Sequence, residues 1–244
     1  MRHDVRVARV FGRCLALVLV VAWSLSSCSD ASPDTAPTGV DELVIPTPSP
    51  DPSDFVERID NPWLPLARGH RWSYTMRIGD QQYARTVLVL PDPEQVAGVA
   101  TTVVETTKVQ ADDGVPSGTP APTRDYFAED RRGNVWWFGR EGEWRAGEDG
   151  AQAGLAMPAG PRYGDGWRMA YGEGVVDVRA SVVTLDQSAT VPAGRFTDLV
   201  GIETRSALEP GTVTRSFYAR GAGLVEEVSV EGPTSVVQLE SGPS

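Results

Sequence analysis

The residues best suited to do chemistry are three carboxylates that lie close in sequence to tryptophans. The carboxylates belong to Glu141, Glu143 and Asp165, and the nearby aromatic residues are Trp136, Trp137, Trp144 and Trp167. Paired carboxylates supply the acid and the base of glycoside hydrolysis, and aromatic platforms suit sugar rings. One hypothesis is therefore a glycan-acting hydrolase that uses Trp-flanked carboxylates. The alternative is a tryptophan-rich core beside solvated charges in turns.

Other reactive groups are scarce in this chain of 244 residues. Two cysteines and two histidines are too few for a Cys/His zinc cluster. The sequence has neither a Gly-x-Ser-x-Gly elbow nor a Gly-x-x-x-x-Gly-Lys phosphate loop. The acidic turns at 112–113 and 129–130 lack the spacing of a calcium loop. We therefore expect no metal, no cofactor and no enzymatic activity. The net charge of −11 also argues against nucleic acid as a partner.

A lipid attachment site is indicated near the N-terminus. Four arginines precede an apolar run from about Leu15 to Leu25, and the residues Leu25-Ser26-Ser27-Cys28 resemble a lipobox. The resemblance implies that residues 1–27 are a lipoprotein signal peptide and that the Cys28 thiol is lipidated. The alternatives are an ordinary signal peptide or a membrane-spanning helix, but the apolar run is short for a span. The membrane is then a partner through this anchor, on the extracytoplasmic face.

The next segment has the composition of a tether. Residues 28–54 contain six prolines among serine, threonine and aspartate, with few large apolar side chains. Such a stretch buries too little surface to offset the entropy cost of ordering it. We therefore expect a lipidated N-terminus and a disordered Pro-rich tether over 28–54. A single β domain over 55–240 and a flexible tail over 241–244 follow.

Residues 55–240 show a hydrophobic period of two, which is typical of strands. In the stretch Arg71–Ile78, apolar and polar residues alternate without a fault, and Gly79-Asp80 then marks a turn before a returning strand. We predict a loop over the proline-containing residues 115–122 and one helical turn at 196–199. Residues 142–166 show little pattern. The strands are predicted at 71–78, 82–90, 99–109, 126–128, 135–138, 175–185, 199–206, 212–220, 224–230 and 235–239.

About ten strands joined by tight turns predict an all-β protein with at most short helical turns. Strands with one apolar face favour a strongly curved antiparallel sheet, which we picture as a half-open barrel. We expect a monomer.

Several motifs resemble those of a known family. The stretch Asp60-Asn61-Pro62-Trp63-Leu64-Pro65-Leu66 is followed by further motifs at 124–128, 191–196 and 217–225. Together they resemble a family of uncharacterised secreted bacterial lipoproteins of the actinobacterial type. The resemblance covers about residues 55–230 and implies no catalytic residue. The repeated hairpins also resemble, at the level of the fold alone, the half-open β-sheets of lipoprotein carriers.

Five aromatic residues are candidates for a ligand-binding surface. If they project from the concave side of the sheet, they line an apolar groove for an acyl chain or a hydrophobic peptide. The alternative is that they fill a closed core. The five residues are Trp72, Tyr74, Tyr126, Trp136 and Phe217.

These observations favour a membrane-anchored lipoprotein of the cell envelope that binds a ligand without catalysis. The ligand is a lipid, a glycan or a protein, so a hydrophobic small molecule or an envelope protein is the expected partner. The alternatives are the glycan-acting hydrolase and a protein-interaction or structural module. The module would show an exposed apolar patch or an open sheet edge.

Overall fold

A computed structural model of the chain describes residues 51–112 and 115–244. The predicted signal peptide, Cys28 and nearly all of the predicted tether lie outside the described residues. The last tether residues form a 3-10 turn, η1 (Pro52–Asp54), which the Asp51 side chain caps by accepting a hydrogen bond from the Ser53 amide. Within the described ranges, no helix has the length and apolar character that crossing a bilayer requires.

Fifteen strands make up the rest of the regular structure. Their bounds are β1 (Phe55–Val56), β2 (Arg71–Ile78), β3 (Gln81–Val89), β4 (Glu94–Val96), β5 (Val99–Asp112), β6 (Val115–Asp130), β7 (Val135–Arg140), β8 (Trp144–Arg145), β9 (Gln152–Met157), β10 (Gly166–Gly172), β11 (Val176–Val191), β12 (Gly194–Ser206), β13 (Val213–Ala219), β14 (Gly223–Glu231) and β15 (Ser235–Ser241).

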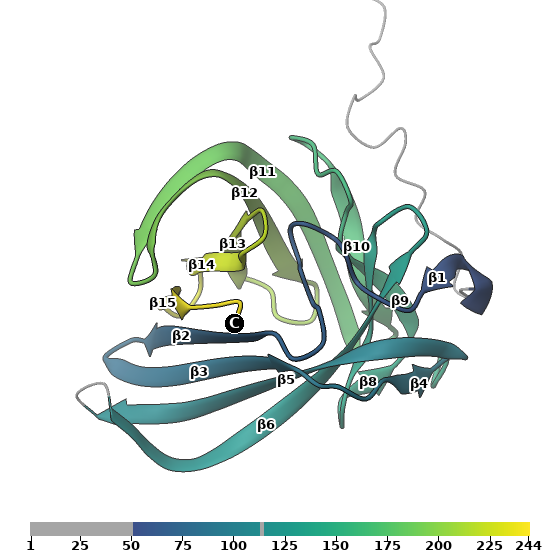
Figure 1. The fold of residues 1–244 in the computed structure, drawn as a ribbon, viewed down its shortest axis with the longest axis horizontal. Coiled ribbons are helices and arrows are strands. Elements are labelled where there is room, and N and C mark those ends of the chain that lie inside the picture. The colour runs from purple at the N-terminus through teal and green to yellow at the C-terminus, as the bar shows by residue number, and fades with distance from the viewer. Residues whose placement is uncertain (1–50, 113–114) are drawn as a thin grey trace, which may run out of the picture. The chain divides into compact units, whose positions relative to one another are not determined.

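The strands form one antiparallel sheet that curves until it closes (Figure 1). The order around the ring is β6-β5-β3-β2-β15-β14-β13-β12-β11-β10-β9-β7, and the pairing of β7 with β6 completes it. The strands β1, β4 and β8 pair with ring strands from outside this path. The predicted all-β class and strong antiparallel curvature are confirmed, and the sheet is closed rather than half open.

The alternating pattern of β2 explains how the sheet acquires an inside and an outside. Trp72 and Tyr74 are buried, while Arg71 and Thr75 on either side of this pair are exposed. Successive side chains of a strand point to opposite faces, so the apolar set lies within the ring. The two-residue turn that joins β2 to β3 places Gly79 at a φ of 56°, which a glycine adopts without strain.

Three local predictions differ from the structure. Residues 115–122 belong to β6 rather than to a loop; prolines are tolerated there because this part of β6 pairs only with β5 and leaves its other edge free. Residues 196–199 are part of β12, not a helical turn. Near the C-terminus, Ser244 and Arg71 exchange two backbone hydrogen bonds, so the expected tail lies along the start of β2.

Candidate ligand-binding cavity

A cavity of about 260 Å³ lies inside the closed sheet. Its wall combines apolar side chains with charged and phenolic ones, and it is lined from β2, β3, β5, β6, β7, β9, β10, β13 and β14 and by the segment before β2. The main apolar lining residues are Leu64, Trp72, Phe127, Trp137, Met169 and Leu224. The polar ones are Tyr74, Arg85, Asp125, Arg140, Tyr218 and Glu227.

The polar residues reach the interior as directly opposed neighbours on adjacent strands. Asp125 faces Arg140 across β6 and β7. Tyr74 faces Arg85 across β2 and β3, and Glu227 on β14 faces Ser216 on β13. Opposed residues of an antiparallel pair project from the same face, so Asp125 enters the cavity with Arg140 and Tyr74 with Arg85, while Ser216 lies beside Glu227 without lining the cavity.

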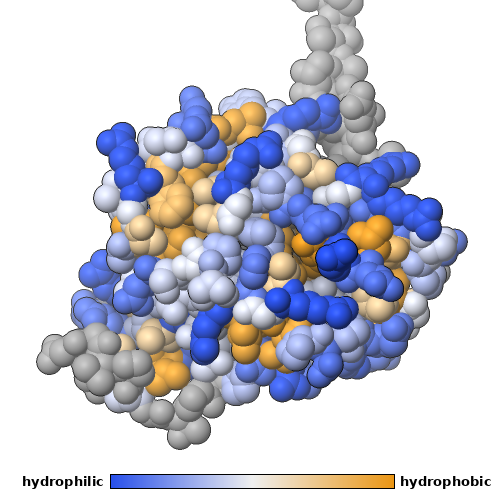
Figure 2. All heavy atoms as spheres, in the orientation of Figure 1, coloured by the Kyte–Doolittle hydropathy of each residue, from blue (hydrophilic) through white to orange (hydrophobic). Residues whose placement is uncertain are grey.

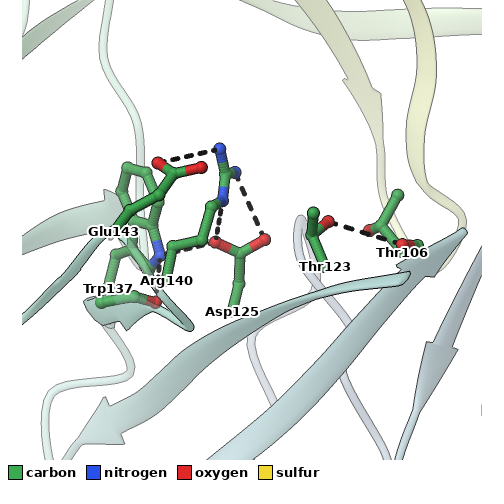
Figure 3. Close-up of polar contacts among 7 residues, drawn as sticks. Thr106, Thr123, Asp125, Trp137, Arg140 and Glu143 are labelled. Atoms are coloured by element: carbon green, nitrogen blue, oxygen red, sulfur yellow. Dashed lines mark hydrogen bonds and ion pairs between the residues drawn. The ribbon is translucent and has the colours of Figure 1, made fainter. Parts of the chain in front are cut away.

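The first interior pair, Asp125 and Arg140, is fully bonded (Figure 3). Arg140 Nε lies 2.9 Å from Asp125 Oδ1, and Arg140 Nη2 lies 3.3 Å from Oδ2. Trp137 Nε1 donates to Asp125 Oδ1 at 3.0 Å and to the Gly139 carbonyl at 2.8 Å. On its far side, Arg140 lies 3.9 Å from the Glu143 carboxylate. A two-pronged pair of this kind is the strongest contact that a guanidinium makes with a carboxylate.

Burial governs the ionisation of this pair. It raises the pKa of Asp125, and the neighbouring Arg140 and the hydrogen bonds from Arg140 and Trp137 only partly oppose the rise. Burial alone would lower the pKa of the Arg140 guanidinium, but the adjacent Asp125 charge raises it instead. The carboxylate is therefore costly to keep ionised, while the guanidinium stays charged.

The second interior pair, Arg85 and Glu227, is loosely bonded. Arg85 Nη1 lies 3.9 Å from Glu227 Oε1, which is beyond hydrogen-bonding distance. The buried Arg85 Nε has no hydrogen-bond partner. The other carboxylate oxygen of Glu227 accepts a hydrogen bond from Ser216 Oγ at 2.9 Å. Arg85 therefore presents unused donors to the cavity.

Two tyrosines flank the loosely bonded pair. Tyr74 Oη donates to the Leu224 carbonyl at 3.2 Å, and the centre of its ring lies 5.6 Å from the Arg85 guanidinium carbon. Burial raises the pKa of Tyr74, and burial with the nearby Glu227 charge raises the pKa of Tyr218 to about 12. Both phenols are therefore neutral at physiological pH and can donate hydrogen bonds.

The segment 60–66 closes part of the cavity. Its residues Leu64, Pro65 and Leu66 line the wall. The segment is fixed by the buried Glu129, whose Oε2 accepts hydrogen bonds from the Asp60 and Asn61 amides, each at 2.7 Å. We refer to residues 60–66 as the closing segment. In Figure 1 the chain leading from β1 to β2 crosses between the two sides of the ring.

Asn61 holds the closing segment from within. Its Oδ1 accepts from the Trp63 amide at 2.9 Å and from the Leu64 amide at 3.1 Å, and its Nδ2 donates to the Gly133 carbonyl at 2.8 Å. The side chain is 1% exposed, so its amide is satisfied by the protein rather than by water. The part of the cavity wall that the closing segment provides is therefore held in place by specific hydrogen bonds.

The five predicted aromatic residues divide between the cavity and the packed core. Trp72 and Tyr74 line the cavity. Tyr126, Trp136 and Phe217 are buried in the core and are not among the lining residues. Tyr126 lies under the Arg145 guanidinium, 4.5 Å from it, and Trp136 donates to Asp130 Oδ2 at 3.0 Å.

The carboxylates proposed for glycan chemistry are engaged elsewhere. Glu141 and Glu143 lie in the turn after β7, where they contact Arg124 and Arg140 respectively, and both side chains are more than half exposed. Asp165 is buried before β10 and accepts a hydrogen bond from the Arg162 amide at 2.9 Å. Among the described residues, no group of three metal-binding side chains is arranged to hold an ion.

Sequence reasoning did not single out Arg85, Asp125, Arg140 or Glu227. A signal for one of them exists, because Arg85 shares its strand parity with Val87 and Val89 and therefore interrupts an apolar face. A charge on an apolar face of a predicted strand is a marker of an interior polar site.

No protein-family model and no curated protein matches this chain. Two crystal structures are similar to it. One, from Bacteroides fragilis, is described as an exported protein with a YmcC-like fold; it is 14% identical, covers 73% of this chain and 97% of its own, and gives a TM-score of 0.43. The other, from Parabacteroides distasonis, is described as a lipoprotein; it is 15% identical, has the same two coverages and gives a TM-score of 0.37.

Proposed function

We propose that this chain is a membrane-anchored lipoprotein of the cell envelope that binds a small amphipathic molecule, without catalysis, inside its closed sheet. The observation that carries the proposal is the cavity itself. Its volume of about 260 Å³ lies near the lower end of small-molecule sites, which run from about 300 Å³ upward. Its wall combines apolar side chains with charged and phenolic ones, which suits a molecule with an apolar body and a polar head.

The extracytoplasmic address rests on the N-terminal sequence. The arginine-rich start, the apolar run and Leu25-Ser26-Ser27-Cys28 support lipidation at Cys28. The resemblance of the closing segment to secreted actinobacterial-type lipoproteins supports the same address. Two acyl chains anchor a protein stably, because each buried methylene contributes about 0.8 kcal/mol.

Neither alternative function has an observation of comparable weight. The carboxylates at Glu141, Glu143 and Asp165 are held by other groups in separate parts of the fold. On the face drawn in Figure 2, the apolar side chains form separate groups among hydrophilic ones. A docking module would instead favour one continuous apolar patch or an open sheet edge, and the free edge of β6 at 115–122 contains prolines, which hinder pairing with another strand.

Binding of heptan-1-ol tests the cavity. This probe is uncharged and amphipathic, and we expect it to bind in calorimetry and to raise the melting temperature of the protein. The variant Val87→Phe fills the cavity and should abolish binding. The control Val228→Phe places the same ring on half-buried Val228 of β14, which is not a lining residue, and should leave binding intact. Absence of binding to the parent protein, or equal binding to both variants, contradicts the proposal.

Labelling with radioactive palmitate in the native host tests the anchor. We expect the parent protein and the control Cys14→Ala to incorporate label and to fractionate with membranes. Cys28→Ala should do neither, because the thiol that carries the lipid is gone. Incorporation into Cys28→Ala would place the lipid elsewhere and overturn this part of the proposal.

A further inference from the structure

Arg85 is the cation in the cavity whose hydrogen-bonding capacity the protein leaves unused. Its Nε is buried and unpartnered, and its closest acidic contact is the 3.9 Å approach of Nη1 to Glu227 Oε1. No hydrogen bond joins its side chain to any residue of the described ranges. A guanidinium carries five donors, and the buried Nε of Arg85 is costly to leave unpaired away from water.

The other arginine of the cavity, Arg140, has a guanidinium whose donors are bound by acceptors of the protein. Arg140 meets both oxygens of Asp125 at 2.9 and 3.3 Å and also approaches Glu143. Arg85 has no such acceptor, although its side chain is only 24% exposed. The difference marks Arg85, not Arg140, as the group with donors to offer a ligand.

We infer that the cavity takes a short monocarboxylic acid whose carboxylate binds the Arg85 guanidinium in the space between Tyr74 and Tyr218. This inference rests on the proposed binding function and specifies its ligand class. The planar guanidinium fork matches a carboxylate in a two-pronged contact. Both phenols are neutral, so neither repels the ligand, and both lie on the wall around Arg85.

Glu227 sets the charge of the head group. One of its oxygens is bound by Ser216, and the other lies 3.9 Å from Arg85. This carboxylate repels an anion at Arg85, and it repels a phosphate of nearly two charges more strongly than a carboxylate of one. Taking a doubly charged head out of water also costs more than taking out a singly charged one, so the cavity favours a singly charged head over a phosphate monoester.

The rest of the cavity sets the length of the apolar body. At about 30 Å³ for each water-sized group, a volume of about 260 Å³ holds about nine non-hydrogen atoms. Leu64, Trp72 and Leu224 on the same wall offer the apolar surface. Heptanoate, with nine non-hydrogen atoms, fits this space.

Calorimetric titration of the full chain at neutral pH and low salt tests the inference with heptanoate, heptan-1-ol, heptylamine and heptyl phosphate. We expect heptanoate to bind the parent at least tenfold more tightly than heptan-1-ol. Arg85→Gln should remove that advantage, and Arg85→Lys should keep part of it because the charge remains while the fork is lost. The control Arg215→Gln removes a half-exposed arginine that pairs with Glu203, and it should behave like the parent.

Every other outcome contradicts one specific part of the inference or of the proposed function. Equal binding of acid and alcohol to the parent, or undiminished binding of heptanoate to Arg85→Gln, refutes the role of Arg85 and leaves the cavity standing. Tighter binding of heptyl phosphate or heptylamine than of heptanoate refutes the carboxylate head. If none of the four probes binds the parent, the proposed binding function fails as well.

Discussion

Two pairs of opposite charge lie inside this ring of strands, and they are built differently. Asp125 and Arg140 come from β6 and β7, which are adjacent and close the sheet. Arg85 and Glu227 come from β3 and β14, which are separated by β2 and β15, so their contact reaches across the interior. The adjacent pair is drawn to hydrogen-bonding distance by its strands, whereas the distant pair is held apart. We propose that the first pair stabilises the fold and that the second is available to a ligand.

The largest effect is expected when Arg140 is removed from the hydrogen-bonded pair that it forms with Asp125. Arg140→Met keeps the aliphatic packing but leaves the Asp125 carboxylate buried without its partner. We expect a loss of about 3 kcal/mol in the free energy of unfolding, measured by denaturant titration. Arg85→Gln is the matched change in the open pair and should cost less than about 1 kcal/mol, since no protein hydrogen bond is lost. Equal losses would erase the distinction between the two pairs.

A smaller effect should follow from removing the indole donor that supports the closed pair. Trp137→Phe deletes the hydrogen bonds to Asp125 Oδ1 and to the Gly139 carbonyl, and we expect a cost of about 2 kcal/mol because one acceptor is charged. Trp72→Phe deletes a bond to the neutral Ala222 carbonyl and should cost about 1 kcal/mol in the same denaturation assay. A larger loss for Trp72→Phe would contradict this ranking.

The smallest effect concerns pH. Burial raises the pKa of Asp125 above its ordinary value of 3.8, so the folded protein holds this proton more tightly than the unfolded chain. Ionised Asp125 therefore lowers stability above its native pKa, and that loss is recovered as the pH falls from the native pKa towards 3.8. Relative to Asp125→Asn, the parent should gain free energy of unfolding as the pH falls from the native pKa of Asp125 towards 3.8, as measured by denaturation at several pH values. A relative loss over the same interval would reverse the sign of the shift.

Much of the strand pattern was predictable because alternation reports burial directly. All ten predicted strands exist, and the turn at Gly79-Asp80 lies where expected. The five others, β1, β4, β8, β9 and β10, are short or contain glycine and alanine. At Gly154 an added Cβ would lie 2.4 Å from the Met169 backbone, so the close contact of β9 with β10 requires glycine at this position. Glycine has no side chain and therefore leaves a gap in the hydrophobic pattern of the strand. Weak patterning there reflects tight packing rather than a loop.

The site was less predictable because it depends on register and closure. Asp125 and Arg140 flank a hairpin that the sequence does predict, but their pairing also requires a register shift between Tyr126 and Phe127. Arg85 and Glu227 lie on strands separated by β2 and β15, so they meet only because the sheet curves. Trp72 and Tyr74 were found because strand parity places them on the inner face. Tyr126 and Trp136 are equally aromatic, so residue type alone could not separate core from cavity.

The closing segment also bears on how the molecule assembles. Asn61 and its neighbours bond to groups that come 68 to 97 residues later in the chain. Contacts of such long sequence separation form only after the intervening chain has been ordered, and they slow folding. One of the first segments of the domain along the chain is thus among the last to reach its final position.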